Sequence, residues 1–238
     1  MRVPSVFHDT LLFDLDGTLV DSVDGLHVAA VASAAVAGGP VPTHDFVRNA
    51  IGRGVDMLIH RVASGDQDGR IGPEIHARSR ARFDEVYAES CLAGTSIRLG
   101  VRPVLEEFRR QGRRLVIATN KPRRPARILI QHLDLVSLVD DVVCPDDAGV
   151  RKPDPAFAAH ALGGRTESTG LLVGDSSIDA ETARRAGIPF VAIRGGYDEG
   201  RRIDDLQPPP DRIVDEPRDL PGAIASLEDT PMKKRPSN

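Results

Sequence analysis

The sequence contains little cysteine, and no stretch of it resembles a membrane anchor. Its 238 residues include two cysteines, Cys91 and Cys144, which lie far apart and lack the spacing of a metal site. We expect both thiols to be reduced and structural, as is typical of a cytoplasmic protein. No apolar run is long enough to cross a bilayer. The net charge of -4 gives no electrostatic reason to expect nucleic acid or an anionic membrane as a partner.

Lysine is also rare in this chain. Among 31 basic residues only four are lysines, namely Lys121, Lys152, Lys233 and Lys234. The last two belong to a polar C-terminal tail, residues 230–238, which we expect to be disordered. A lysine offers a compact ammonium where an arginine offers a broad planar fork. The two lysines of the folded body therefore mark positions where a compact cation is expected.

The most distinctive segment is an apolar run that ends in two acids. Residues 11–15 are followed at once by a turn at Gly17, and Asp14 and Asp16 stand at the end of the run. The run predicts a buried strand, along which alternation would send both carboxylates to the same side. Two carboxylates leaving a buried strand together need a cation or a shared proton. An ordinary strand end followed by an Asp-Gly turn is the alternative interpretation.

The remainder of the chain divides into a helical part and an alternating part. Helices are expected at 25–36, from Thr43 or Asp45 to about Ala63, and at 74–89 after Pro73. Beyond Val101, helical patterns alternate with predicted strands, which lie at 114–119, 141–144, 170–173, 190–193 and 212–214. The alternation predicts an α/β fold with a parallel sheet and helices on both faces.

Polar side chains follow several of these strands. They are Asp14 and Asp16, then Thr119, Asn120 and Lys121, then Lys152 in a loop, and finally Asp175 and Asp179. A parallel sheet would gather them at one edge, where ligands of such folds bind. Carboxylates, a hydroxyl, an amide and ammonium groups together suit Mg²⁺ and a phosphate.

Each of these segments also has an ordinary structural interpretation. Thr119 can end a strand and Asn120 can cap a turn. Lys152 can be a solvated loop residue. Asp175 and Asp179 suit an N-cap and an acid in the first turn of a helix. All four segments occur in order after strands or in strand-to-helix loops, however, and this joint occurrence favours a shared site.

The same segments make the chain resemble phosphatases of the haloacid dehalogenase (HAD) superfamily, from Leu11 to about Ala225. F-D-L-D-G-T-L-V-D-S, T-N-K, K-P-D-P and G-D-S-S-I-D resemble motifs I to IV of that superfamily. The helical part resembles its small cap domain. Within the superfamily, the chain is most similar to phosphoglycolate phosphatases, through G-T-L-V-D-S, residues 47–54 and Gly195-Gly196-Tyr197.

The resemblance implies a two-domain enzyme. A Rossmann-like, HAD-type core with a parallel sheet would comprise residues 1–21 and 95–229. A small all-helical cap domain, residues 22–94, would be inserted after the first strand. The substrate would be a small phosphorylated metabolite, with no nucleic acid or membrane partner, and both a monomer and a homodimer stay open.

The resemblance also implies catalytic roles. Asp14 would be the nucleophile that forms an aspartyl-phosphate, and Lys152 would offset the repulsion between its carboxylate and the phosphate. Asp16 would be the general acid for the leaving alkoxide and then the base that activates water. Thr119 and Asn120 would bind phosphoryl oxygens.

Mg²⁺ is the cofactor that the resemblance implies. Its protein ligands would be Asp14, Asp175 and the backbone carbonyl of Asp16. Asp179 would hold the metal's water shell or position Lys152.

Substrate choice is expected to lie in the cap. Arg53, in the turn Gly52-Arg53-Gly54, is a candidate partner for the carboxylate of 2-phosphoglycolate, and a plain surface arginine is the alternative. Lys121 follows motif II, with a surface role equally open. Other functions stay open beside 2-phosphoglycolate hydrolysis: a phosphatase for another small sugar phosphate or sugar-acid phosphate, a mutase resembling β-phosphoglucomutase, or a non-catalytic binding protein.

Overall fold

A parallel sheet of six strands forms the centre of the computed structural model, which describes residues 7–165 and 169–229. The strand order is β5-β4-β1-β6-β7-β8. In that order the strands are Asp141–Val143, Arg114–Ala118, Thr10–Phe13, Gly170–Gly174, Phe190–Ile193 and Arg212–Val214. Every neighbouring pair is parallel. The predicted α/β fold with a Rossmann-like parallel sheet is therefore confirmed, while the expected disordered tail lies outside the described residues.

Strand β1 occupies the middle of the sheet and pairs with both β4 and β6. Phe13 is in register with Ile117 on one side and with Val173 on the other. All of β1 is buried, because helices cover both faces of the sheet, which explains why the strand reads as an unbroken apolar run. The residues that follow β1, β4 and β6 consequently meet at one edge.

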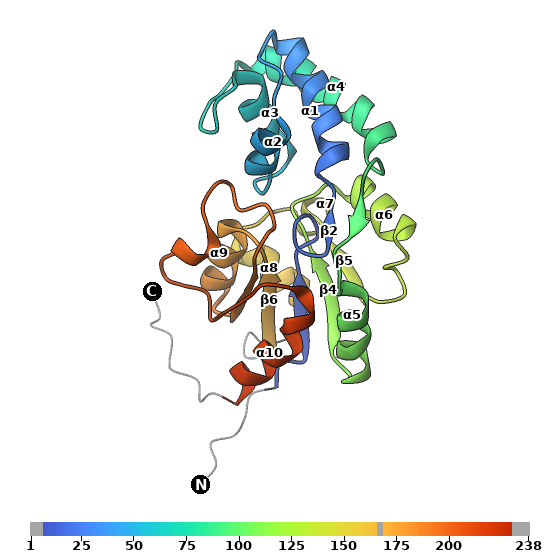
Figure 1. The fold of residues 1–238 in the computed structure, drawn as a ribbon, viewed down its shortest axis with the longest axis vertical. Helices are drawn as coiled ribbons and strands as arrows, with labels where there is room; N and C mark the ends of the chain where they lie inside the picture. The colour runs from blue at the N-terminus through green and yellow to red at the C-terminus, as the bar shows by residue number, and fades with distance from the viewer. Residues whose placement is uncertain (1–6, 166–168, 230–238) are drawn as a thin grey trace.

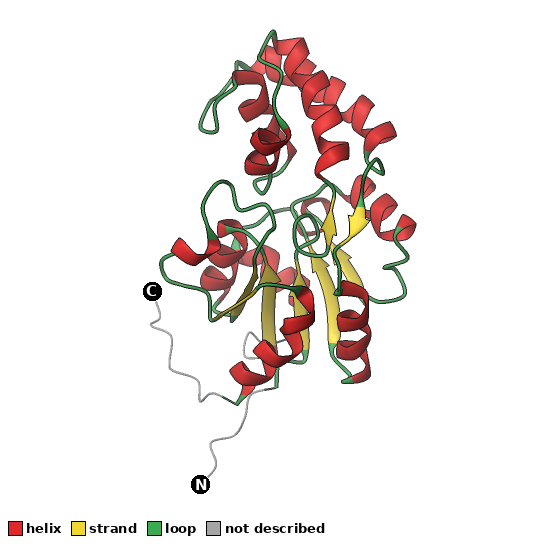
Figure 2. Cartoon of the chain, in the orientation of Figure 1, coloured by secondary structure: helices red, strands yellow, loops and turns green. Residues whose placement is uncertain are grey.

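Helices pack on each face of the sheet (Figure 1, Figure 2). On one face, Leu11 and Phe13 pack in a cluster with α5 (Val101–Arg110), α6 (Arg123–His132) and α10 (Leu220–Glu228). On the other face, Leu12 packs in a cluster with α8 (Pro155–Leu162) and α9 (Ser177–Ala186). The short elements α7, η2 and η3 span Pro145–Ala148, Ile203–Asp205 and Pro217–Asp219.

A second group of helices lies beyond one end of the sheet (Figure 1). It consists of α1 (Val23–Ala37), α2 (His44–Ala50), α3 (Val55–Ser64) and α4 (Pro73–Ser90), and we call it the helical unit. It has its own hydrophobic cluster. Two short antiparallel strands, β2 (Val20–Asp21) and β3 (Ser96–Ile97), join it to the rest of the chain. The exact domain boundaries stay a prediction.

One expected helix is divided in two. The hydroxyl of Thr43 caps α2 by accepting a hydrogen bond from the backbone N–H of Phe46 at 3.1 Å. The helix then ends at Ala50, and α3 begins at Val55. Gly52 and Gly54 lie between them with φ angles of 128° and 86°, which interrupt the helical path. The single helix predicted from Thr43 or Asp45 to about Ala63 was therefore wrong.

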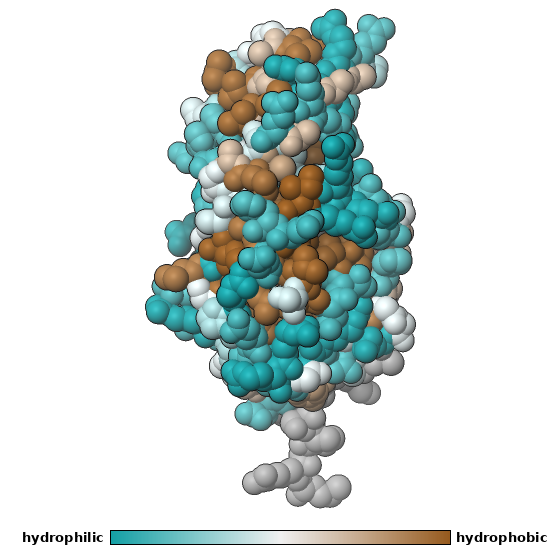
Figure 3. All heavy atoms as spheres, turned by 90° about the vertical axis from the view of Figure 1, so that its right-hand side faces the viewer, coloured by the Kyte–Doolittle hydropathy of each residue, from teal (hydrophilic) through white to brown (hydrophobic). Residues whose placement is uncertain are grey.

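An apolar groove runs between the helical unit and the core on the face shown in Figure 3. It has a volume of about 250 Å³. Its apolar lining includes Val55, Phe83, Tyr87, Pro122 and Ile128. Three of its lining residues, Val55, Tyr87 and Pro122, also line the site cavity described below. The groove and the cavity are therefore adjacent.

The loop that follows β7 connects the core to the helical unit. Tyr197 of this loop is buried in the hydrophobic cluster of the helical unit. The Glu199 carboxylate is 5% exposed, with Oε1 at 3.0 Å from Arg61 Nη2 and at 2.9 Å from Arg53 Nε. Its other oxygen accepts a hydrogen bond from the Ser177 hydroxyl at the start of α9. One carboxylate therefore ties α9, α3 and the turn before α3 together.

We expect Glu199→Gln to destabilise the protein. The change leaves the buried guanidinium of Arg61 without its carboxylate, which should lower the free energy of unfolding by about 1–3 kcal/mol. Urea denaturation measures it. Glu85→Gln is the matched control, because the exposed Glu85 carboxylate pairs with Arg82 at the surface and should have no measurable effect. Equal effects of the two substitutions would contradict the connecting role of Glu199.

Candidate active site

A small cavity lies at the edge of the sheet beneath the helical unit. Its volume is about 50 Å³. The core contributes its polar lining, which includes Asp14, Asp16, Thr119, Asn120, Lys121 and Asp175. The helical unit and the turn before α3 contribute a mostly apolar lining, which includes Leu26, Ile51, Val55, Leu58 and Tyr87. The structure thus brings residues from three of the four predicted segments to one place.

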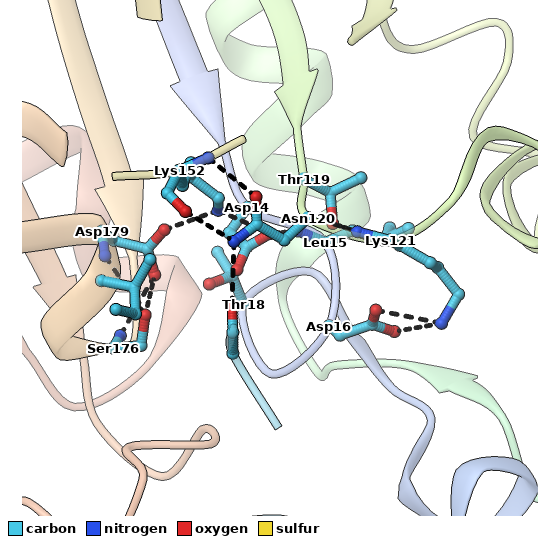
Figure 4. Close-up of polar contacts among 12 residues, drawn as sticks. Asp14, Leu15, Asp16, Thr18, Thr119, Asn120, Lys121, Lys152, Ser176 and Asp179 are labelled. Atoms are coloured by element: carbon cyan, nitrogen blue, oxygen red, sulfur yellow. Dashed lines mark hydrogen bonds and ion pairs between the residues drawn. The ribbon is translucent and has the colours of Figure 1, made fainter. Parts of the chain in front are cut away.

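Three carboxylates and one ammonium form the centre of the site. One oxygen of each of Asp14, Asp175 and Asp179 lies within 4.8 Å of the others. Lys152 Nζ lies 3.0 Å from Asp14 Oδ1 and 2.7 Å from Asp179 Oδ1, and its side chain is 1% exposed (Figure 4). When all three acids are ionised, one ammonium leaves two negative charges uncompensated. A buried, all-oxygen set with this charge fits a divalent hard cation.

Burial and the neighbouring carboxylates raise the pKa values of Asp14 and Asp175. Burial raises the pKa of Asp14 from 3.8 to about 6, with Lys152 opposing the shift and Asp179 adding to it. Burial, Asp179 and Asp14 together raise the pKa of Asp175 well above its ordinary value. Hydrogen bonds from Thr18 Oγ1 and from the backbone N–H of Tyr197 oppose that second shift. A bound cation would favour the ionised forms of both acids.

Two glycines allow the chain to approach Asp175 closely. A Cβ atom at Gly196 would lie 2.2 Å from Asp175 Oδ2, and one at Gly17 would lie 2.3 Å from the same oxygen. Gly17 also has a φ of 88°. The close approach lets the backbone N–H of Tyr197 donate to Asp175 Oδ2 at 2.6 Å. The segment Gly195-Gly196-Tyr197 is thus a backbone support for a carboxylate of the site.

Asp179 serves the fold and the site together. Ser176, rather than Asp175, is the N-cap of α9, and its hydroxyl accepts from the backbone N–H of Asp179 at 3.2 Å. Asp179 Oδ2 in turn accepts from the backbone N–H of Ser176 at 3.2 Å, which completes a capping box. The other oxygen of Asp179 accepts from Lys152 Nζ. The first-turn acid and the residue that positions Lys152 are therefore the same.

Asn120 holds the backbone of Lys152. Its Oδ1 accepts from the backbone N–H of Lys152 at 2.9 Å, and its Nδ2 donates to the carbonyl of Lys152 at 3.1 Å. Nδ2 also donates to the carbonyl of Gly52 at 3.0 Å, in the turn before α3. Lys152 is accordingly a buried, oriented cation rather than a solvated loop residue, and the amide of Asn120 contacts protein groups at both ends.

Asp16 differs from the expectation that it shares a side with Asp14. Strand β1 ends at Phe13, and the chain then folds into a tight loop in which the carbonyl of Leu15 accepts from the N–H groups of Leu19 and Val20. The Asp16 carboxylate consequently points away from Asp14 (Figure 4). The strand-alternation argument was wrong here because the strand is shorter than the apolar run.

The partner of Asp16 is Lys121, the second lysine of the body. Lys121 Nζ lies 3.0 Å from both carboxylate oxygens of Asp16, and its side chain is 3% exposed. A surface role for Lys121 is therefore wrong. Burial alone would lower the pKa of Lys121, but Asp16 and Tyr87 raise it above its ordinary value, so the ammonium stays charged.

Arg53 does not line the cavity in this structure. Its guanidinium contacts Glu199, and its side chain is 39% exposed. Tyr87, in the cavity lining, is closer to the site, and the sequence analysis did not single it out. Tyr197, beside Asp175, was named there only as part of Gly195-Gly196-Tyr197. The two are the only tyrosines of the chain, and this rarity is a signal that could have marked Tyr87.

The comparisons with known proteins identify the family. A family model described as haloacid dehalogenase-like hydrolase matches residues 11–193. The chain belongs to this family. It is 35% identical over 187 residues to a phosphoglycolate phosphatase of Cereibacter sphaeroides, covering 79% of this chain and 85% of the relative. It is 36% identical over 214 residues to phosphoglycolate phosphatase 1 of Pseudomonas aeruginosa, covering 88% and 77%.

Solved structures of haloacid dehalogenase-like proteins have the same fold. A crystal structure from Haemophilus somnus, described as that of a predicted phosphoglycolate phosphatase, superposes with a TM-score of 0.81 at 26% identity, covering 90% of this chain and 96% of that one. With the relatives above, it makes this chain a phosphatase of the haloacid dehalogenase type, a family whose phosphatases generally need a divalent metal. Within residues 7–165 and 169–229, no helix has the length and apolar character needed to cross a membrane.

The stability of the metal-free protein should fall as the pH rises through about 6. The pKa of Asp14 is raised on folding from 3.8 to about 6, so the stability that its bound proton contributes is complete below pH 3.8 and is lost as the pH rises through 6. We expect wild-type protein in EDTA to lose about 1–3 kcal/mol relative to Asp14→Asn between pH 5 and pH 7.5. Thermal unfolding at both pH values, with and without Mg²⁺, measures it. Parallel pH curves for the two proteins would contradict the burial of an ionised Asp14.

Asn120→Ala should impair the site through Lys152. The substitution removes three hydrogen bonds that hold two loops together, which should lower the free energy of unfolding by about 1–3 kcal/mol and phosphatase kcat by roughly tenfold or more. Urea denaturation and phosphate release measure the two effects. Asn49→Ala is the control, because the Asn49 amide makes no side-chain hydrogen bond within the described ranges. If kcat survives in Asn120→Ala, Asn120 does not position Lys152.

Proposed function

We propose that this phosphatase hydrolyses 2-phosphoglycolate to glycolate and phosphate through an aspartyl-phosphate on Asp14. The observation that carries the proposal is the buried ammonium of Lys152 between Asp14 and Asp179, next to a cavity that also contains Asp16. The names of the relatives supply the substrate, because phosphoglycolate phosphatases match 79–88% of this chain in the two comparisons above.

The first step is attack by Asp14 on phosphorus. Lys152 holds the attacking carboxylate in place and offsets the repulsion between it and the phosphate dianion. Thr119 lines the cavity beside Asp14, and we assign its hydroxyl to a phosphoryl oxygen. Asn120 acts mainly by fixing the loop that carries Lys152.

We assign the proton transfers of the reaction to Asp16. It would donate to the leaving alkoxide and later accept a proton from the water that attacks the aspartyl-phosphate. Its carboxylate lies in the same cavity as Asp14 but in a different ion pair, so the two acids have separate environments.

We assign the divalent ion to Asp14, Asp175 and the backbone carbonyl of Asp16, next to Asp179 in the same carboxylate cluster, and propose that it is Mg²⁺. When bound, the ion would neutralise charge on the transferring phosphoryl group. Asp179 would serve it through Lys152 or through the ion's water shell.

The helical unit acts in this proposal as a cap that excludes water. The mostly apolar residues that it contributes to the lining of the cavity would keep water from the reacting groups. The cytoplasmic location stays a prediction.

Phosphate release from a panel of esters tests the proposal. With Mg²⁺, we expect kcat/KM for 2-phosphoglycolate to exceed kcat/KM for small sugar phosphates, nucleotides and pyrophosphate. Asp14→Asn should lower kcat by at least about 10³-fold, since it removes the nucleophile. Asp45→Asn, at an exposed position in the first turn of α2, should match wild type. A different preferred ester would overturn the substrate, and an active Asp14→Asn would overturn the mechanism.

A further inference from the structure

The cavity contains a cation that the reaction described above does not use. Among the described residues that line it, Lys121 is the only basic one, beside the carboxylates of Asp14, Asp16 and Asp175. The roof of Leu26, Ile51, Val55 and Leu58 offers no charged side chain. An anionic group on a ligand in this cavity therefore has one ammonium available to it.

Lys121 lines the cavity, and its ammonium can make a further hydrogen bond. Its two hydrogen bonds to a carboxylate both go to Asp16, at 3.0 Å each, and the Tyr87 hydroxyl lies close enough to interact with the ammonium as well. An ammonium has three donors. Nζ also lies 5.1 Å from the centre of the Tyr87 ring, so the aromatic residue flanks the ammonium.

Tyr87 provides an independent sign that a ligand is missing. The residue is 4% exposed, and its buried hydroxyl, which the Lys121 ammonium approaches, donates to no acceptor among the described residues. A buried hydroxyl proton without an acceptor is unfavourable. An acceptor in the cavity, next to Lys121, would satisfy it.

We propose that Lys121 Nζ and Tyr87 Oη bind the carboxylate at the non-reacting end of the substrate and thereby select an acidic leaving group. This inference rests on the proposed phosphatase function and names the residues that read its substrate. A carboxylate offers acceptors to both donors at once. The hydroxyls of a sugar, in contrast, would find no partners on the apolar roof, and a site rejects ligands whose polar groups it leaves unpaired.

The proposal replaces Arg53 as the reader of the carboxylate. The Arg53 guanidinium donates to Glu199 and does not line the cavity. Lys121 follows the strand end that also carries Thr119, whose Oγ1 accepts from the backbone N–H of Lys121 at 3.2 Å. The phosphate side and the carboxylate side of the site would thus be connected through two adjacent peptide units.

A pair of substrates that differ in the carboxylate tests the subsite. 2-Phosphoglycolate has it, and ethyl phosphate has the same two-carbon chain without it. The measured quantity is kcat/KM for 2-phosphoglycolate divided by kcat/KM for ethyl phosphate. Effects on the chemistry that both substrates share cancel in that ratio. We expect Lys121→Met to lower the ratio roughly 10- to 100-fold and Tyr87→Phe roughly 3- to 10-fold, mainly through KM for 2-phosphoglycolate.

Two further variants sharpen the result. Arg124→Met removes an exposed cation of the adjacent groove and should leave the ratio at the wild-type value. Arg53→Met tests the competing assignment of the carboxylate to Arg53. If the ratio falls in that variant alone, the assignment to Lys121 and Tyr87 is overturned. Tyr87→Phe keeps the buried ring and removes a hydroxyl that donates to no acceptor among the described residues, so we expect its unfolding temperature to stay close to that of the wild type. Loss of discrimination in that variant then cannot be attributed to misfolding.

The outcomes separate this inference from the proposed function. If both substrates are hydrolysed but neither Lys121→Met nor Tyr87→Phe changes the ratio, the subsite is wrong and the phosphatase stands. If wild type hydrolyses neither ester, the proposed function fails, and calorimetric binding of the same two esters to Asp14→Asn with Mg²⁺ decides the subsite. In that binding experiment, the relevant ratio is the Kd of ethyl phosphate divided by the Kd of 2-phosphoglycolate. A fall of at least tenfold in this ratio in Lys121→Met supports the subsite, and an unchanged ratio overturns it.

Discussion

The buried ammonium of Lys152 is the interaction on which the site depends. It lies between Asp14 and Asp179, two acids that would otherwise repel each other in a region largely shielded from solvent. Buried charges are tolerated only when they are paired and hydrogen-bonded. Asn120 supplies the remaining constraint by binding the backbone of Lys152 at both ends and by reaching Gly52 as well. The first turn of α9, the Lys152 loop and the turn before α3 are therefore organised around one charge.

Lys121 and Lys152, the two lysines among the described residues, pair with different acids of the site. Lys152 belongs to the cluster of Asp14, Asp175 and Asp179, and Lys121 belongs to Asp16. The tight loop after β1 makes this division possible, because it turns Asp16 away from Asp14 within two residues. A compact ammonium fits into each narrow space, where the wider guanidinium of arginine would need more room. In a chain that otherwise uses arginine, the choice of lysine at these two positions follows from the shape of the site.

The sequence was sufficient to predict the central strands of the sheet because β1, β6 and β7 are buried along their whole length. Strand β7 was predicted with its observed bounds, and β6 was predicted one residue too short, because the observed strand also includes Gly174. Side-chain partners were harder to predict because they come from distant parts of the chain. Nothing local relates Arg61 to Glu199, which lie 138 residues apart. The direction of Asp16 also depends on a loop, to which strand periodicity does not apply. Asp14, Asp175 and Lys152 were found because strand ends of a parallel sheet meet, a rule that needs no knowledge of side-chain contacts.

The burial of both lysines also determines how the protein reacts with chemical reagents. Lys121 and Lys152 are 6% and 2% exposed, and the other two lysines of the sequence, Lys233 and Lys234, lie outside the described residues. Within residues 7–165 and 169–229, an amine-directed dye, cross-linker or resin therefore finds no accessible lysine side chain. Coupling through amines leaves the surface of the described fold unmodified, and arginine- or carboxylate-directed chemistry is needed to label it.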